Sequence, residues 1–166
     1  MRKPLVLLAL IIIAVTVVVV ALIFLRVFRI PFFQIEVLGI STSAVHWIGW
    51  AGTLYIAFAT PAYPIVKRKY SQHLKKMLNI HVLGNLLAVL LVSIHFAHQV
   101  TRSASNYPDL GTGIVLYATM ILLVATGLVL VSGIGSKLVK QLRFLHPAFA
   151  ITFYTVIIMH VIHGIV

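Results

Sequence analysis

Five long apolar runs limit what this chain can fold into. They cover residues 4–25, 44–66, 77–100, 112–132 and 144–166. A helix needs about 20 apolar residues to cross a bilayer, and only helices or closed barrels satisfy their backbone hydrogen bonds there. Barrel strands would be shorter and would alternate apolar with polar residues, unlike these runs. We therefore predict an all-α integral membrane protein, a bundle of about five transmembrane helices, multi-pass in the cell membrane and surrounded by the lipid bilayer.

The charged residues are few and unevenly placed. They make up 9% of the chain, against about 25% in soluble domains. Of the thirteen Lys and Arg residues, ten fall at the amino terminus and in the loops 67–76 and 137–143. Because basic loops stay in the cytoplasm, we predict the N-terminus inside and the C-terminus outside, and no nucleic-acid partner for the net charge of +11. The third and fifth helices then run in the same direction.

The chain has no cysteine and eight histidines. Thiolate-ligated haem, iron–sulfur clusters and covalently attached c-type haem are thereby excluded, and a bound metal cofactor has to rest on histidine. Six of the histidines form two sets with the same spacing, fourteen residues and then three: His81, His95 and His98, and His146, His160 and His163.

This spacing has a geometric meaning. Fourteen residues advance a helix by about 21 Å and return it to within about 40° of the same face. If the two faces oppose one another, His81 meets His146 on the inner side and His95 meets His160 on the outer side. Each pair would supply two axial imidazoles to one iron, which predicts two non-covalent haem b groups. A zinc site would need ligands that converge at one point.

The histidines also have other interpretations. Structural hydrogen bonding or another metal would account for some of them, although ionisable side chains in membrane helices are costly and usually functional. His98 is turned about 100° from His81, so we expect His98 and His163 to contact haem propionates with Arg102, or to be alternative ligands. Two further cations are predicted at the inner haem, as propionate contacts or as ordinary interfacial anchors: Lys76 and Arg143. No catalytic residue is predicted, and neither His46 nor His73 is assigned to a haem.

The arrangement resembles the ferric reductase-like transmembrane superfamily, which includes ferric reductases and NADPH oxidases. The resemblance rests on His81, His95, His146 and His160, on the third and fifth helices after basic loops, and covers residues 44–166. It implies that electrons from a cytosolic flavin domain cross two b haems to an outer acceptor. Since the chain carries no Gly-rich phosphate loop, we expect a redox partner protein or a membrane quinol as donor.

A second resemblance is to the cytochrome b of quinol–cytochrome c complexes. It rests on the fourteen-residue spacing and on His81-Val82-Leu83-Gly84, which is similar to an H-x-x-G motif whose glycine lets porphyrin lie against the backbone. It implies an alternative function, the cytochrome b anchor subunit of a quinol-linked respiratory complex. A non-redox small transporter or assembly protein is the alternative from a different class.

We thus predict a di-haem b-type membrane cytochrome that moves electrons across the bilayer. It would be an oxidoreductase component without its own flavin or NAD(P)H domain. In domain terms, residues 1–43 form a signal-anchor helix and outer loop, and residues 44–166 form a four-helix haem-binding domain.

Overall fold

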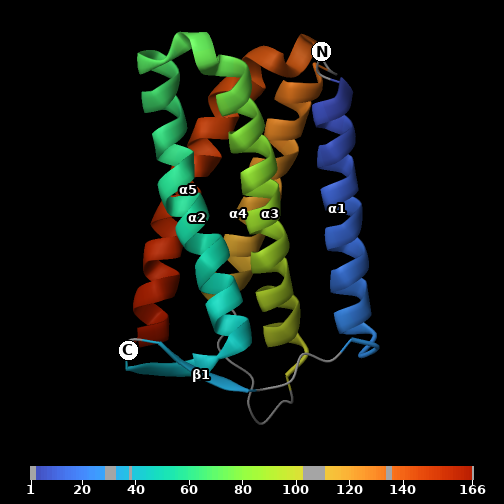
Figure 1. Cartoon of the computed structure of the whole chain (residues 1–166), viewed down its shortest axis with the longest axis vertical. Helices are drawn as coiled ribbons and strands as arrows, with labels where there is room; N and C mark the ends of the chain where they lie inside the picture. The colour runs from blue at the N-terminus through green and yellow to red at the C-terminus, as the bar shows by residue number, and fades with distance from the viewer. Residues whose placement is uncertain (1–2, 29–32, 38, 103–110, 134–135, 166) are drawn as a thin grey trace. The chain divides into compact units, whose positions relative to one another are not determined.

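The computed structural model describes residues 3–28, 33–37, 39–102, 111–133 and 136–165. Five long helices account for most of them (Figure 1), and two short 3-10 turns precede the third and fifth, η1 (Ser71–His73) and η3 (Ser136–Leu138). The helices are α1 (Lys3–Phe24), α2 (Ala44–Lys69), α3 (Leu74–Val100), α4 (Gly111–Ser132) and α5 (Val139–Ile165). The predicted helical class is confirmed, and each apolar run corresponds to one helix.

Four of the described helices are long and apolar enough to cross a membrane: α1, α3, α4 and residues 139–162 of α5. This supports a multi-pass membrane protein with one candidate span fewer than the sequence analysis expected. The difference is α2, which has 26 residues but includes Pro61 and Pro64 and ends in Lys67, Arg68 and Lys69. The prolines, with the Gly, Thr, Trp and Tyr residues spread along α2, lower its mean hydropathy without breaking the helix, and the three basic residues follow the apolar run.

The contacts between residues divide the chain into two compact units. One unit is residues 8–107, and the other combines residues 1–7 with residues 108–166. The predicted domain boundary after residue 43 stays a prediction.

In the first unit, α2 and α3 form an antiparallel pair joined through η1. The two helices come close at Gly52, where an added Cβ would lie 2.8 Å from the Ala88 carbonyl oxygen. Further along, the Tyr55 hydroxyl donates to the Ile80 carbonyl oxygen at 3.2 Å. Glycine at the crossing point therefore lets the two helix backbones come together.

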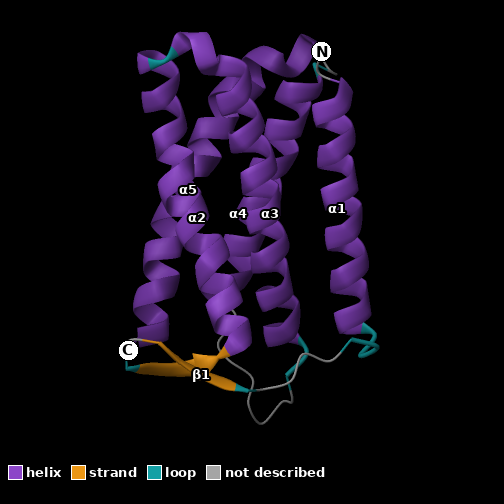
Figure 2. Ribbon diagram, in the orientation of Figure 1, coloured by secondary structure: helices purple, strands orange, loops and turns teal. Residues whose placement is uncertain are grey.

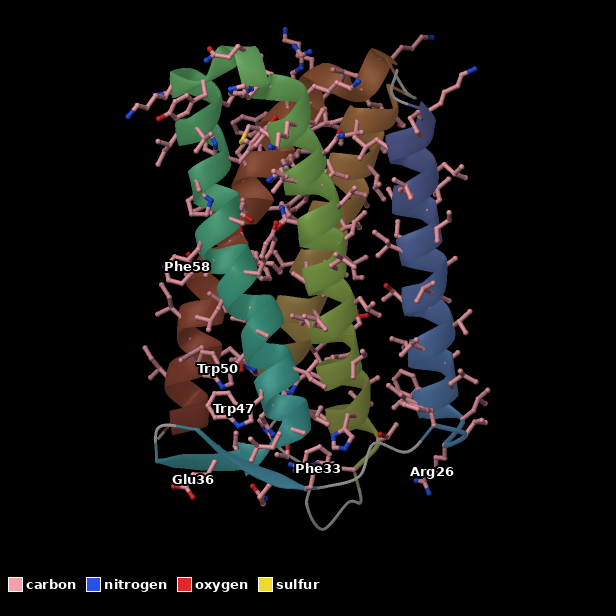
Figure 3. The ribbon with its side chains drawn as sticks, viewed as in Figure 1. Arg26, Phe33, Glu36, Trp47, Trp50 and Phe58 are labelled. Carbon is pink, nitrogen blue, oxygen red and sulfur yellow. The ribbon has the colours of Figure 1, made fainter. Side chains whose placement is uncertain are left out.

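A small strand pair precedes α2, which the sequence analysis treated as loop. Strands β1 (Gln34–Val37) and β2 (Ile40–Ser43) are antiparallel (Figure 2). The Trp47 indole N–H donates to the Ile35 carbonyl oxygen at 3.0 Å, which attaches the first turn of α2 to β1 (Figure 3). The hairpin therefore fixes the start of the helix that packs on α3.

In the second unit, α4 and α5 form another antiparallel pair. The helix α4 ends at Gly133, whose φ of 73° is the left-handed conformation that glycine adopts after a helix. The Gly133 N–H donates back to the Val129 carbonyl oxygen at 3.2 Å. Buried side chains on this pair include Met120 on α4 and Phe153 on α5.

Large apolar side chains are exposed along the helices of both units. Examples are Val17 on α1, Phe58 on α2 (Figure 3) and Ile151 on α5, each more than 60% exposed. Contiguous exposed apolar surface of this kind is rare on soluble monomers and is the expected surface against lipid.

Candidate functional site

The four predicted ligand histidines lie in two helix pairs, and each ring has a neighbour at its Nδ1 atom. His81 and His95 project from α3 in the α2–α3 pair, and His146 and His160 project from α5 in the α4–α5 pair. The identity of the neighbour at Nδ1 decides which ring nitrogen carries the lone pair.

The neighbour of His95 determines which tautomer this histidine adopts. Its Nδ1 lies 3.3 Å from the carbonyl oxygen of Val45 on α2. A carbonyl oxygen only accepts, so Nδ1 carries the proton and Nε2 the lone pair. Gly49 lies directly against the ring, since an added Cβ there would be 2.8 Å from His95 Cγ.

His81 lies against two residues near the other end of the same helix pair. The Tyr63 ring stacks on it at 4.3 Å between centroids, with 21° between the planes. The Asn85 amide nitrogen lies 3.1 Å from His81 Nδ1, and its oxygen accepts from the Thr60 hydroxyl at 3.3 Å. Because an amide and a hydroxyl can exchange donor and acceptor roles, this pair of neighbours suits either tautomer of His81.

In the α4–α5 pair, both histidines meet threonine. Thr126 Oγ1 lies 3.0 Å from His146 Nδ1, and Thr112 Oγ1 lies 3.0 Å from His160 Nδ1. The Thr126 hydroxyl donates its proton to the Leu122 carbonyl oxygen at 2.9 Å. With its proton on that carbonyl, the Thr126 oxygen would accept from His146 Nδ1, which would place the His146 lone pair on Nε2.

A glycine follows each of these threonines and leaves room for the ring. An added Cβ at Gly127 would lie 3.1 Å from His146 Cε1, and one at Gly113 would lie 3.4 Å from His160 Cε1. The two Thr-Gly steps are fourteen residues apart, as are the two histidines. Because α4 and α5 are antiparallel and both separations are fourteen residues, the contact between a histidine ring and a Thr-Gly step occurs twice along the pair.

The sequence analysis missed these supporting residues. The Thr-Gly repeat at 112–113 and 126–127 was a readable signal, because its period equals that of the histidines. The Val45 carbonyl and the Asn85 amide gave no such signal, since their roles depend on how α2 pairs with α3.

His46, which received no haem role, lies beside the His95 ring. The two ring centroids are 5.1 Å apart in an edge-on arrangement. Ser43 Oγ lies 2.7 Å from His46 Nδ1, and the Gln99 amide nitrogen lies 3.4 Å from His46 Nε2. His46 therefore belongs to the packing that holds His95 in place.

The remaining predicted residues lie at helix ends or are buried elsewhere. His98 is buried on α3, and the side chain of His163 lies outside the described residues. Arg102 follows the end of α3 and is partly exposed, whereas Lys76 and Arg143 are exposed near the starts of α3 and α5. Their contacts with propionates stay predictions, and so do the pairings of His81 with His146 and of His95 with His160. His73 is exposed in η1.

Gly84 of the H-x-x-G segment faces a protein side chain. An added Cβ at Gly84 would overlap the Tyr55 hydroxyl and ring. The glycine thus makes room for Tyr55 of α2, and this contact does not support the porphyrin role that the second resemblance implies.

Two further observations bear on the cofactor and the family. Within the described part of the chain, no group of three or more His, Cys, Asp or Glu side chains is placed to hold one metal ion. A bis-imidazole haem takes two protein ligands, and the contact of His95 Nδ1 with the Val45 carbonyl leaves Nε2 of that ring available as one such ligand. Comparison of the chain with protein-family models, curated proteins and solved structures finds no match.

Proposed function

We propose that this protein is a b-type cytochrome that binds two haems and carries electrons across the membrane. One observation carries the proposal. Four histidines recur at the same fourteen-residue separation on α3 and α5, and each has its Nδ1 atom beside a polar neighbour.

The ring nitrogens suit metal ligation. An iron-bound histidine uses a neutral imidazole, and its other ring N–H is normally held by a carbonyl, a carboxylate or another acceptor. The Val45 carbonyl and the Thr126 hydroxyl hold Nδ1–H of His95 and His146 in this way. Histidines that served only as interhelical hydrogen bonds would not need equal spacing on two helices.

The pairing of the histidines is part of the proposal. Consecutive membrane spans alternate in direction, and α3, α4 and α5 are all candidate spans. Under the proposal α3 and α5 run parallel, so His81 and His146 form an inner pair while His95 and His160 form an outer pair. The two positions on each helix are about 21 Å apart along the axis.

We propose that α2 crosses the membrane as a fifth span. It accompanies α3 from Gly49, which lies against His95, to Tyr63, which lies against His81. A helix that packs along fourteen residues of a membrane span is itself at membrane depth. Lys67, Arg68 and Lys69 then lie in the cytoplasm with the N-terminus, as the positive-inside rule favours.

Haem, when bound, supplies the one-electron chemistry, and the residues of this chain position it. The histidines bind iron, their Nδ1 neighbours orient the rings, and the apolar helices exclude water. Electrons would enter from a partner protein or a membrane quinol in the cell membrane and leave to an acceptor on the other side. The protein would act as a component of an oxidoreductase, as its resemblance to the ferric reductase-like superfamily implies.

Single histidine variants test both the ligands and the pairing. In purified protein, His81→Leu and His146→Leu should lose one haem, and His95→Leu and His160→Leu should lose the other, as seen in reduced-minus-oxidised spectra. His73→Leu is the control, because that histidine is exposed in η1 and should leave both haems bound. If His98→Leu, and not His95→Leu, removes the outer haem, the ligand assignment is wrong. If both haems survive all four ligand variants, the proposed function fails.

The electron donor is tested on the wild-type protein. Rapid haem reduction by a quinol analogue would identify a quinol-linked subunit, and reduction by a soluble flavoprotein would favour a ferric reductase-like arrangement. Reduction by neither, with both haems bound and reducible by dithionite, would exclude both donor classes.

A further inference from the structure

The two Thr-Gly steps of α4 have a function beyond helix packing. We propose that Thr126 and Thr112 are positioning residues, which orient His146 and His160 and lower the reduction potential of the haem that each histidine holds. This inference rests on the proposed function. It adds that α4, which contributes no ligand, influences both haems.

Thr126 has two carbonyl acceptors within reach of its one hydroxyl proton. Its Oγ1 lies 2.9 Å from the Leu122 carbonyl oxygen and 3.0 Å from that of Leu123, and with the proton on either carbonyl Thr126 acts as an acceptor toward His146. Only the oxygen lone pairs remain for His146 Nδ1, which lies 3.0 Å away. Since Thr126 is buried, water does not compete for this contact. The tautomer and the ring plane of His146 are therefore both set by α4.

Thr112 makes the equivalent contact in a more open place. It is the second residue of α4, is partly exposed, and lies 3.0 Å from His160 Nδ1 through its hydroxyl oxygen. Water at the helix terminus can exchange with this hydroxyl, so we expect Thr112 to have the smaller effect.

Gly127 makes room for the contact between Thr126 and His146. A Cβ at Gly127 would come within 3.1 Å of His146 Cε1, the ring atom between the two nitrogens. The ring would have to tilt away from Thr126 to relieve that contact. At this step threonine supplies the acceptor and glycine supplies the space. At Gly113 an added Cβ would lie 3.4 Å from His160 Cε1, which is ordinary contact.

The chemical effect has a definite sign. An acceptor at Nδ1–H raises the basicity of the imidazole at Nε2 and so favours the more highly charged ferric iron. Loss of the acceptor should therefore raise the reduction potential. One hydrogen bond corresponds to a change of about threefold to tenfold in the equilibrium constant for haem reduction. For a one-electron couple this is about 30–60 mV.

The ordinary alternative is that these threonines only bond to their own helix. Thr119 does so, because its hydroxyl donates to the Val115 carbonyl oxygen at 2.8 Å. It is buried on α4 and lies seven residues from both Thr112 and Thr126. Thr119 is therefore a matched control for the loss of a threonine hydroxyl from this helix.

The test is a potentiometric titration of both haems in purified variants. We expect Thr126→Val to raise one potential and Thr112→Val to raise the other by less, while Thr126→Ser restores the wild-type value and Thr119→Val changes neither. Loss of a single haem in Thr126→Val alone would give the same conclusion. Unchanged potentials in Thr126→Val with both haems bound, or an equal shift in Thr119→Val, would overturn the inference.

A second measurement needs neither a variant nor bound haem. In haem-free wild-type protein with ¹⁵N-labelled histidine, NMR should report the proton of His146 on Nδ1. A proton on Nε2 would overturn the inference even if the variants fail to fold. A wild-type preparation that never contains haem would instead refute the proposed function, so the two failures are distinguishable.

Discussion

If the protein binds two haems as proposed, substitution of Gly49 by alanine should remove the outer haem by displacing His95. The added Cβ would lie 2.8 Å from His95 Cγ, about 0.6 Å short of the 3.4 Å at which ordinary contact begins. A ring shift of that size would stretch the 3.3 Å contact between His95 Nδ1 and the Val45 carbonyl to about 3.9 Å, which is no longer a hydrogen bond.

The expected loss of stability follows from the same contact. Overpacking costs about 1–3 kcal/mol and the lost hydrogen bond about 0.5–1.5 kcal/mol. Alanine regains about 1 kcal/mol over glycine in a helix. The free energy of unfolding should therefore fall by about 0.5–3.5 kcal/mol, which alone need not unfold the protein.

Two alanine variants separate a displaced ligand from simple loss of packing. Gly52→Ala brings a Cβ to 2.8 Å from the Ala88 carbonyl oxygen, an equal clash in the same helix pair but away from the histidines. Gly113→Ala places a Cβ at 3.4 Å from His160, which is ordinary contact.

The assay is the haem-to-chain ratio in purified protein, together with thermal unfolding. We expect one haem in Gly49→Ala and two in both Gly52→Ala and Gly113→Ala, although Gly52→Ala should be as destabilised as Gly49→Ala. Two haems with unchanged spectra in Gly49→Ala, or loss of the same haem in Gly52→Ala, would refute the argument.

Two other contacts give predictions of a different kind. Tyr63→Leu removes the ring stacked on His81 and should lower the free energy of unfolding by about 0.5–1.5 kcal/mol. It should also shift the electron paramagnetic resonance signal of the inner haem, whereas Tyr63→Phe should preserve that signal. A wild-type signal in Tyr63→Leu would contradict this. Trp47→Phe removes the bond to the Ile35 carbonyl and should make the strands β1 and β2 more sensitive to protease while both haems stay bound. Unchanged cleavage would show that this bond does not hold the hairpin.

The helices were predictable from the sequence because continuous apolar runs of about 20 residues fit a helix that spans the membrane and do not fit the short alternating strands of a barrel. The predicted starts were several residues late for two of them. The third was expected from residue 77 and the fifth from residue 144, whereas α3 begins at Leu74 and α5 at Val139. The additional residues include Lys75 and Lys140, which are good helix formers whose long side chains reach the aqueous interface.

Other features depend on pairing, which one sequence does not reveal. The strand pair has only four residues in each strand, too few for a clear alternation. The contacts of His95 with Gly49 and Val45 depend on the register between α2 and α3, since these residues are about fifty positions apart. The fourteen-residue spacing of the histidines could be recognised in the sequence because residues fourteen apart lie on nearly the same face of a helix. The fourteen-residue spacing of the Thr-Gly steps of α4 could be recognised for the same reason.

Haem content of the wild-type protein is the most direct measurement of the central claim. Protein purified from cells supplied with iron and a haem precursor should contain two haems per chain, with the low-spin spectrum of bis-imidazole b-type haem in both oxidation states. A folded, colourless protein under those conditions would contradict the account, and one haem per chain would contradict the pairing of four histidines around two irons.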